Sequence, residues 1–251
     1  MNVSQDYTQA DHAARGVDHY AEMKFRILMD RIPRGTPLKI LNVGCGAGHA
    51  TEWLAERGHV VHAIDPDADA IRMGAERIQN GGIDDPRIVL KQASLEDYVS
   101  ADRYDAVFAL DVLEHIADDP GALAKMHSLL KPGGLIFAAV PAMPSLFGHH
   151  DVMLGHYRRY TATTLRQRVL PWFEVIYLRY FGMSLVPVAL AYSRILKRAY
   201  PIQQSHDVGV VRFVLNLLLA LERQIVLPRG TSLLLIGRAL KSHESQAGVE
   251  A

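Results

Sequence analysis

The sequence predicts an α/β fold built on a doubly wound, mostly parallel sheet. A helix between successive strands is what a parallel sheet requires. Short apolar runs alternate with helical patterns through the first half of the chain, at residues 38–43, 60–64, 88–91, 104–110 and 135–140. Three alternating glycines follow the first run, and an aspartate follows the second. In such a sheet a ligand binds beyond the carboxyl ends of the strands, which is where these residues fall.

The glycine-rich turn after the first predicted strand indicates a site for a nucleotide-type ligand. It contains Gly44, Gly46 and Gly48, and a helical pattern begins at His49. A turn of this kind exposes bare main chain, and the helix that follows presents free N–H groups to a ligand. The G-x-G-x-G spacing is one residue shorter than the dinucleotide fingerprint. No Lys-Ser or Lys-Thr pair follows, which excludes a phosphate-binding P-loop.

The amino-acid composition limits the classes of partner, metal site and compartment that this protein can have. Lysine plus arginine and aspartate plus glutamate both number 27, so no basic excess favours a nucleic-acid partner. Cys45 is the only cysteine, which excludes an intramolecular disulfide and a cysteine-based zinc site and fits a reducing compartment. The polar N-terminus resembles no secretory signal, and residues 1–14 read as disordered. We therefore expect a cytoplasmic protein without a confident transmembrane helix.

Four ordered motifs over residues 38–140 resemble those of class I S-adenosylmethionine-dependent methyltransferases, in particular the ubiquinone-pathway O-methyltransferases. They are LNVGCGAGH at 41–49, Asp65 placed 21 positions after Gly44, YDAVFALDVLEHI at 104–116 and LLKPGGLIFAAVP at 129–141. The resemblance implies a single domain over 1–251 with a Rossmann-like sheet of seven strands, the last of them antiparallel. It further implies a cofactor-binding core at 38–140 and an N-terminal cap helix at 15–33.

The resemblance also implies that S-adenosylmethionine is the cofactor and S-adenosylhomocysteine the product. Asp65 would accept hydrogen bonds from the ribose hydroxyls, the alternative being that it only caps the next helix. Ser94 and Leu95 would lie at the edge of the adenine ring, although many members carry an aspartate at this turn. Another departure is Asn42, where many members have an acid. The cofactor-binding residues expected from these matches are Gly44, Cys45, Gly46, Gly48, Asp65, Pro66, Ser94, Leu95, Leu110, Asp111 and His115.

A polar cluster at 147–160 is the candidate for catalysis and acceptor binding. His150 or His156 can take a proton from an acceptor hydroxyl, and Asp151 can orient such a histidine. Arg158 or Arg159 can hold a carboxylate or phosphate of the substrate. With Tyr160, these arginines form the predicted substrate-binding set. The alternative is an internal network in which Asp151 pairs with an arginine and the histidines only rigidify the loop.

Metal binding is the weaker interpretation of the histidines. Glu114 and His115 have no third ligand at a suitable spacing, so we expect them to line or buttress the pocket. His149, His150 and His156 are zinc ligands by residue type, but methyl transfer from a sulfonium requires no metal. We therefore predict no bound metal.

The remaining sequence predicts the substrate-side half, residues 141–251. Strand patterns at 173–180 and 231–238 are 50 residues apart, too far for an unstructured loop. Two apolar helices, at 183–200 and 208–227, are expected to fill this insertion at 183–227. They would roof an apolar acceptor pocket, form a homodimer interface or rest on a membrane surface; plain packing against the sheet is the remaining alternative.

Together these features predict a methyltransferase that acts on a small or medium, apolar, lipid-like acceptor. The rate would come mainly from aligning nucleophile, methyl group and sulfur in a dry pocket. O-methylation is the first choice, C- or N-methylation the second, and a non-catalytic protein that binds S-adenosylmethionine is the third.

Overall fold

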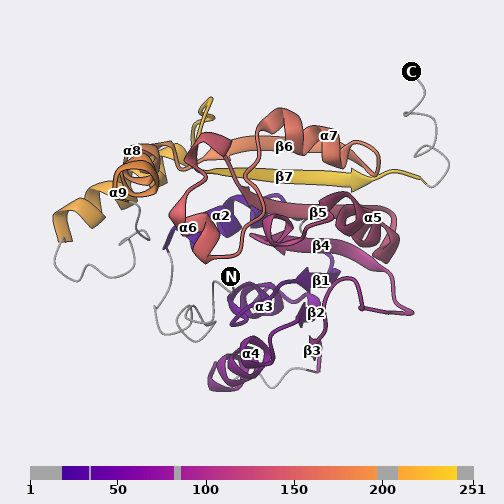
Figure 1. Cartoon of the computed structure of the whole chain (residues 1–251). Coiled ribbons are helices and arrows are strands. Elements are labelled where there is room, and N and C mark those ends of the chain that lie inside the picture. Colours follow the sequence, from indigo (N-terminus) through magenta and orange to yellow (C-terminus); the bar gives the residue numbers. More distant parts are fainter. Residues whose placement is uncertain (1–18, 34, 82–85, 197–208, 242–251) are drawn as a thin grey trace.

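The computed structural model describes residues 19–33, 35–81, 86–196 and 209–241, and these form a seven-stranded sheet flanked by helices (Figure 1). The strand order is β3-β2-β1-β4-β5-β7-β6. Strands β1 to β5 are parallel, whereas β7 runs antiparallel to both of its neighbours, β5 and β6. The strands are β1 (Lys39–Val43), β2 (Val60–Asp65), β3 (Ile88–Gln92), β4 (Tyr104–Leu110), β5 (Leu130–Pro141), β6 (Phe173–Phe181) and β7 (Ser232–Ala239). The predicted fold class is confirmed.

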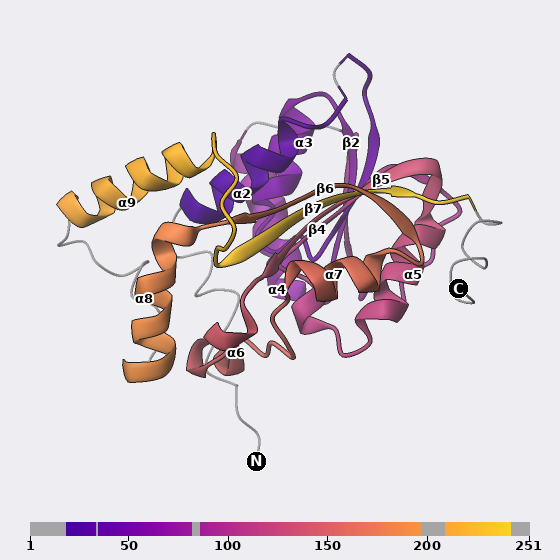
Figure 2. The same cartoon turned by 90° about the horizontal axis from the view of Figure 1, so that it is seen from above.

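Helices cover both faces of the sheet, as a doubly wound fold requires (Figure 2). On one face α2 (His19–Met29) and α3 (His49–Glu56) bury Leu28 and Leu54 against the sheet. On the other face α5 (Asp119–Leu129) and α7 (Ala162–Val169) bury Leu123 and Leu165. Helix α4 (Ala68–Asn80) contacts α3, β2 and β3. The central strands are therefore apolar on both sides, which explains their unbroken hydrophobic runs.

Helix ends follow the capping residues of the sequence. Helix α4 begins after Asp67, whose carboxylate accepts the amide N–H of Asp69 at 2.8 Å. Helix α7 begins after Thr161, whose hydroxyl accepts the N–H of Thr164 at 3.0 Å. The cap helix predicted for 15–33 is observed as α2 over His19–Met29, while residues 1–18, including the segment expected to be disordered, lie outside the described residues.

The sheet register brings the predicted site segments together at one edge. Val43 at the end of β1 is aligned with Ile64 of β2 and with Ala109 of β4. Leu110 at the end of β4 is aligned with Ala139 of β5. The glycine turn, Asp65, the segment after β4 and the segment after β5 therefore leave the sheet side by side.

The insertion between β6 and β7 is more irregular than the two helices that the sequence predicts. Its first part consists of a short 3-10 turn, η3 (Met183–Leu185), then α8 (Val186–Leu190) and a π-helical stretch, η4 (Ala191–Leu196). The second helix, α9, covers Gly209–Glu222 and ends earlier than predicted. Residues 197–208 lie outside the described residues.

Two buried charged side chains attach the insertion to the sheet. Arg179 of β6 donates to the carbonyl oxygens of Glu222, the last residue of α9, and of Arg223 and Ile225 beyond it, at 2.5, 3.2 and 2.7 Å. The Glu222 carboxylate accepts the main-chain N–H groups of residues 182, 183 and 184 at 2.7–2.9 Å. Both ends of the insertion are thus fixed by charge-assisted hydrogen bonds, which are about twice as strong as neutral ones.

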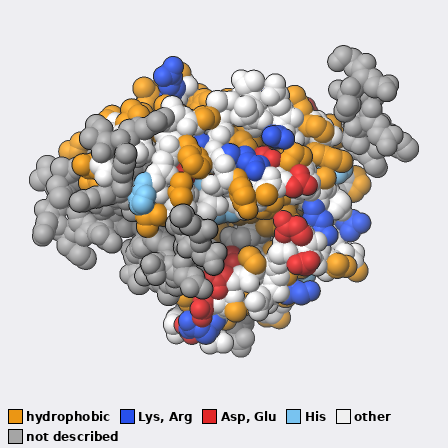
Figure 3. Space-filling view, in the orientation of Figure 1, with side chains coloured by type: hydrophobic (Ala, Val, Ile, Leu, Met, Phe, Trp, Pro, Cys, Tyr) orange, Lys and Arg blue, Asp and Glu red, His pale blue; other side chains and the backbone are white. Residues whose placement is uncertain are grey.

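The outer side of α9 is apolar and exposed. Phe213, Leu217 and Leu221 are 69%, 51% and 56% exposed, whereas Leu219 is buried. Apolar side chains show on the surface over α8 and α9, while elsewhere on the same face acidic and basic side chains are interspersed (Figure 3). Among the described residues, α9 and every other helix are too short or too polar to cross a bilayer.

Candidate cofactor and acceptor site

The glycine turn is held against the end of β2 by main-chain contacts. Gly44 has a φ of +64°, and a Cβ atom there would lie 2.6 Å from Cγ2 of Val112. A Cβ on Gly48, where φ is +80°, would lie 3.0 Å from the Cα of Gly74 in α4. Both positions therefore need glycine for conformation and for space. The turn leads straight into the N-terminus of α3, as the sequence predicts.

Asp65 lies at the end of β2 and braces this turn. One carboxylate oxygen accepts the N–H of Gly46 at 2.9 Å, and the other accepts the N–H of Asp67 at 3.0 Å. Burial raises the pKa of Asp65, while these two hydrogen bonds act in the opposite direction. Each oxygen keeps acceptor capacity for a further hydroxyl. Helix α4 is capped by Asp67, so the alternative role of Asp65 as the cap is wrong.

The other residues predicted to bind the cofactor near this turn make contacts within the protein or are buried in it. Cys45 is 8% exposed, and burial followed by the charge of Asp65 raises the pKa of its thiol to about 12. Pro66 is exposed, and its carbonyl oxygen accepts from Gln92 at 3.2 Å. The Ser94 hydroxyl donates to Asp97 at 2.8 Å, whereas Leu95 is buried in the core. The sequence predicted none of these contacts.

The last residue of β4, Leu110, is half-buried. It is followed by Asp111, whose φ is +55°. This conformation is uncommon for a residue with a side chain and clusters at functional sites. The Asp111 carboxylate pairs with Lys24 of α2 at 2.5 Å, and the Lys24 side chain is 8% exposed. The cap helix is therefore tied to the carboxyl edge of the sheet.

Asp151 is the centre of a buried network on α6 (His149–Met153), a short helix that the sequence did not predict. Its carboxylate accepts from Nδ1 of His156 at 2.9 Å, from Nε of Arg159 at 2.7 Å and from the N–H of Gly148 at 3.0 Å. Burial alone would raise the pKa of Asp151, but the His156 hydrogen bond and the Arg159 charge hold it below the usual value. Asp151 is thus ionised and orients His156, whereas His149 is exposed and His150 is half-buried.

The predicted substrate residues make contacts inside the protein. Arg158 pairs with Asp119 at 2.6 Å and donates to the carbonyl of Ala117 at 2.6 Å. Tyr160 is 2% exposed and donates to Asp119 at 2.9 Å; burial raises the pKa of its phenol. Arg159, 9% exposed, is bound to Asp151 as described. For these three side chains the geometry favours the alternative of an internal network.

Glu114 is the functional candidate that sequence reasoning undervalued. It lies on η1 (Leu113–His115) with His115, and its side chain is fully buried. The ring of His156 lies edge-on to that of His115, with centroids 4.6 Å apart. One ligating atom from each of Glu114, His115 and His156 lies within 4.8 Å of the others. The signal available in the sequence was the Glu114–His115 pair, but only the fold supplies the third side chain.

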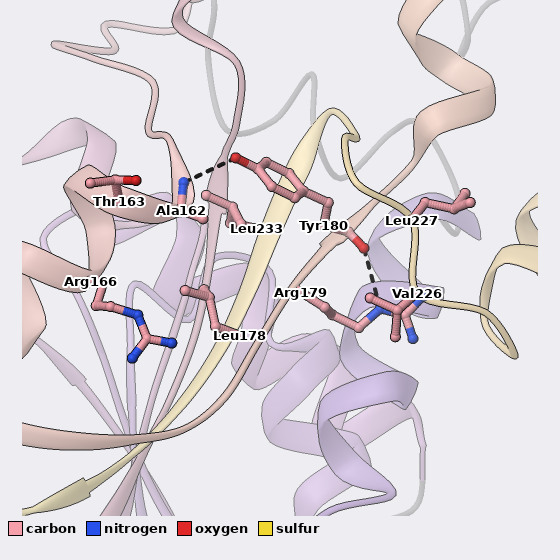
Figure 4. A pocket seen from close by; sticks show the side chains of 9 residues that line it. All are labelled: Ala162, Thr163, Arg166, Leu178, Arg179, Tyr180, Val226, Leu227 and Leu233. Atoms are coloured by element: carbon pink, nitrogen blue, oxygen red, sulfur yellow. Dashed lines mark hydrogen bonds between the residues drawn. The ribbon is translucent and has the colours of Figure 1, made fainter.

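An open groove of about 320 Å³ lies between α7, β6 and the segment after α9 (Figure 4). The hydroxyl of Tyr180 crosses it to accept the N–H of Ala162 at 3.0 Å. The described residues that line it are Ala162, Thr163, Arg166, Leu178, Arg179, Tyr180, Val226, Leu227 and Leu233. None of the predicted site residues is among them, so we do not assign this groove to the cofactor.

The fold and the edge site define an α/β protein of the nucleotide-binding, doubly wound class. A family model described as a methyltransferase domain matches residues 17–170. The chain belongs to this methyltransferase family.

Curated relatives match a shorter segment. The chain is 40% identical over 103 residues to a ubiquinone biosynthesis O-methyltransferase of Methylocella silvestris, covering 41% of this chain and 39% of that protein. It is 41% identical over 108 residues to the mitochondrial ubiquinone biosynthesis O-methyltransferase of Mus musculus, covering 41% of this chain and 29% of that protein. The matched segment thus spans less than half of either relative.

The fold of this chain is similar to that of several solved structures over most of its length. A 1,6-didemethyltoxoflavin-N1-methyltransferase of Burkholderia thailandensis, crystallised with S-adenosylhomocysteine, has a TM-score of 0.59 and 19% identity, covering 93% of this chain and 87% of that one. A [4+2]-cyclase has a TM-score of 0.59 and 17% identity, covering 86% of this chain and 80% of that one. At these identities the likeness shows the Rossmann-like methyltransferase fold and leaves the reaction to the site.

Proposed function

We propose that this protein is an S-adenosylmethionine-dependent O-methyltransferase that acts on an apolar acceptor carrying a hydroxyl group. The single observation that carries the proposal is the position of Asp65. Its carboxylate braces the glycine turn and lies at the same sheet edge as the Glu114, His115 and His156 side chains. The names of the curated relatives favour oxygen as the atom that is methylated.

The residues around the glycine turn fit the cofactor. Gly44 and Gly48 leave the main chain bare, and the Asp65 oxygens retain lone pairs for the two ribose hydroxyls. Ser94 and Leu95 are proposed to lie at the edge of the adenine ring. The rest of the cofactor pocket is proposed to be lined by Leu110, Asp111 and His115. When bound, S-adenosylmethionine supplies an electrophilic methyl group on a sulfonium.

The protein's part in the reaction is to align the acceptor and remove its proton. With the cofactor bound, the acceptor oxygen would form a bond to the methyl carbon while the carbon–sulfur bond breaks, and the electron pair of the broken bond would stay on sulfur. The hydroxyl proton goes to a base. His156 is the first candidate because Asp151 holds its Nδ1 and leaves Nε2 for the proton. His150, half-buried on α6, is the second.

The insertion at 183–227 is proposed to roof the acceptor pocket. Its η4 stretch packs on the start of α6, since a Cβ on Gly148 would lie 2.9 Å from the Ser193 carbonyl oxygen. An apolar cover over this segment would exclude water and keep acceptor and methyl group aligned. We also propose a cytoplasmic location; dimer formation and peripheral membrane contact through α9 are outcomes that gel filtration and fractionation at low and high salt would detect.

Calorimetry and turnover test the proposal together. We expect S-adenosylmethionine to bind, and Asp65→Asn to lower its affinity by about tenfold or more through lost ribose hydrogen bonds. Asp69→Asn is the matched control, because Asp69 is exposed on α4 and pairs only with Arg72 among the described side chains. Formation of S-adenosylhomocysteine with phenolic acceptors, and the mass and connectivity of the product, then distinguish O- from C- or N-methylation. Binding without turnover on any acceptor would favour a non-catalytic role.

A further inference from the structure

Three side chains from two separate segments meet behind the acceptor side of the site. Glu114 and His115 come from η1 after β4, and His156 comes from the segment after α6. Their ligating atoms lie within 4.8 Å of one another. Ligand atoms around a bound cation lie about 3–4 Å apart, so small side-chain rotations would close this set.

The carboxyl group of Glu114 is buried without a hydrogen-bond partner among the described residues. The side chain is completely buried, and neither carboxylate oxygen has a hydrogen-bond partner among the described residues. A buried polar group without a partner is costly, and buried carboxylates are normally paired or coordinate a metal.

His156 is oriented as metal-ligating histidines usually are. Its Nδ1 donates to the Asp151 carboxylate at 2.9 Å, so Nε2 is the nitrogen that remains to ligate. A carboxylate behind the ligating imidazole fixes the tautomer and raises the basicity of the ligand. Arg159, which also contacts Asp151 at 2.7 Å, holds that carboxylate in place.

We propose that Glu114, His115 and His156 bind a divalent transition-metal ion, with Zn²⁺ the first choice. Two imidazole nitrogens and one carboxylate oxygen favour Zn²⁺ and similar first-row ions over Mg²⁺ or Ca²⁺, which prefer all-oxygen sets. Three protein ligands leave a coordination position open, as in catalytic zinc sites. This site departs from the sequence-based prediction of no metal because His156 joins the pair only in the folded chain.

The open position gives the site a use that rests on the proposed function. An acceptor hydroxyl bound there would be polarised and would lose its proton to solvent as it binds, before the roof excludes water. In the metal-loaded protein His156 is then a ligand, and proton removal by its imidazole is no longer required. Acceptors with two adjacent oxygen atoms would gain most, because both oxygens can approach one ion.

Zinc binding is measured first, on protein freed of metal by a chelator and without S-adenosylmethionine. We expect calorimetry to show one zinc site per chain that is absent or at least 100-fold weaker in His115→Ala, a substitution at an exposed position outside the core. Glu114→Gln should weaken binding in the same way, and Asp151→Asn by about 10–100-fold through the hydrogen bond behind His156. His149→Ala is the matched control, an exposed histidine on α6 outside the cluster.

Two results would overturn the inference. Zinc affinity that is the same in His115→Ala and the unmodified protein would place the ion elsewhere. Mg²⁺ binding as tight as Zn²⁺ binding would contradict the imidazole ligand set. Circular dichroism of each variant excludes loss of fold as the cause of weakened binding.

The same samples separate this inference from the proposed function. If zinc fails to bind while S-adenosylmethionine binds and is turned over, the metal site is wrong and the methyltransferase proposal stands. If zinc binds at the cluster while S-adenosylmethionine does not bind, the metal site stands and the methyltransferase proposal is wrong. Loss of turnover on removing zinc, restored by adding it back, supports the role of the ion at the acceptor oxygen.

Discussion

The ammonium group of Lys24 lies 2.5 Å from the carboxylate of Asp111, and this ion pair joins α2 to the end of β4. The Lys24 side chain is nearly buried, and its ammonium also lies 5.1 Å from the centre of the Tyr20 ring. Asp111 holds a positive φ at the position where the predicted cofactor wall begins. The pair therefore couples the cap helix to the backbone of the candidate site.

Replacing Lys24 by methionine should release that coupling. We expect Lys24→Met to weaken S-adenosylmethionine binding several-fold and to lower the free energy of unfolding by about 1 kcal/mol, a modest value because the Asp111 side chain is 40% exposed. Calorimetry and urea denaturation measure the two effects. Arg26→Met is the control on the same helix, since Arg26 pairs with Glu22 and is 55% exposed. Equal losses of cofactor affinity in both variants would contradict the specific role of Lys24.

Gly44 tests whether the turn is limited by conformation or by space. Gly44→Ala adds strain at a φ of +64° and a Cβ atom that meets Val112. We expect it to lower the free energy of unfolding by about 2–5 kcal/mol, the sum of left-handed backbone strain and overpacking. Gly133→Ala isolates the strain, because its φ is +73° and nothing lies within 4 Å of the added Cβ. It should cost about 1–2 kcal/mol.

A second substitution separates the two contributions at Gly44. Removing the Val112 methyl groups in Gly44→Ala/Val112→Ala should recover the overpacking part, so the two changes together cost less than their sum. Urea denaturation of the four proteins in this cycle gives the coupling. Strict additivity would show that the contact with Val112 relaxes without cost.

Gly148 tests the roof over the acceptor pocket. Its φ of −163° suits any residue, so Gly148→Ala acts only through the contact of the new Cβ with Ser193 of η4. Separating η4 from α6 should raise KM for the acceptor several-fold and leave cofactor affinity within about twofold. Val152→Ala is the control, because Val152 lies on the same helix and is 50% exposed. If both ligands lose affinity equally, the insertion is ordinary core.

Cys45 gives a pH-dependent test of the packing at the glycine turn. Because burial raises the pKa of its thiol to about 12, the thiolate fraction at pH 8 is about 10⁻⁴, against roughly a quarter for a free thiol. A thiol reagent should therefore react more than 100-fold more slowly with native than with urea-unfolded protein.

The same thiol affects stability in alkali. Above pH 8.5 the unfolded thiol ionises and the folded one does not, so the free energy of unfolding should fall by about 1.4 kcal/mol per pH unit until the folded pKa is reached. Comparing the pH dependence of unfolding with that of Cys45→Ala isolates this contribution. Identical slopes in both proteins would show that the thiol is accessible to water.

The local sequence pattern was enough to predict the strands and the glycine turn in the cofactor-binding half of the fold. The strands at 38–43 and 104–110 are continuous apolar runs because both sheet faces are covered, and Asp65 stands out at the end of such a run. The number of strands and the antiparallel last strand followed from the resemblance. The strand runs and the position of Asp65 depend on residues that are near one another in the chain.

The acceptor half depended on contacts that no local pattern encodes. His156 lies 42 residues after Glu114 in the chain, and only the register of β4 with β5 brings their segments together. Glu222 is an acidic residue within an apolar stretch of the sequence, yet it is buried against main-chain N–H groups. Helix α6 has five residues, too few to show a hydrophobic period.

The attachment of the insertion through Arg179 and Glu222 has a consequence for how such a protein can change. These side chains bind carbonyl oxygens and amide groups, which every amino acid except proline supplies in full. The side chains along the exposed face of α9 take no part in the attachment. Mutation can therefore alter that face position by position, and new acceptor preferences can evolve over a sheet and cofactor turn that stay the same.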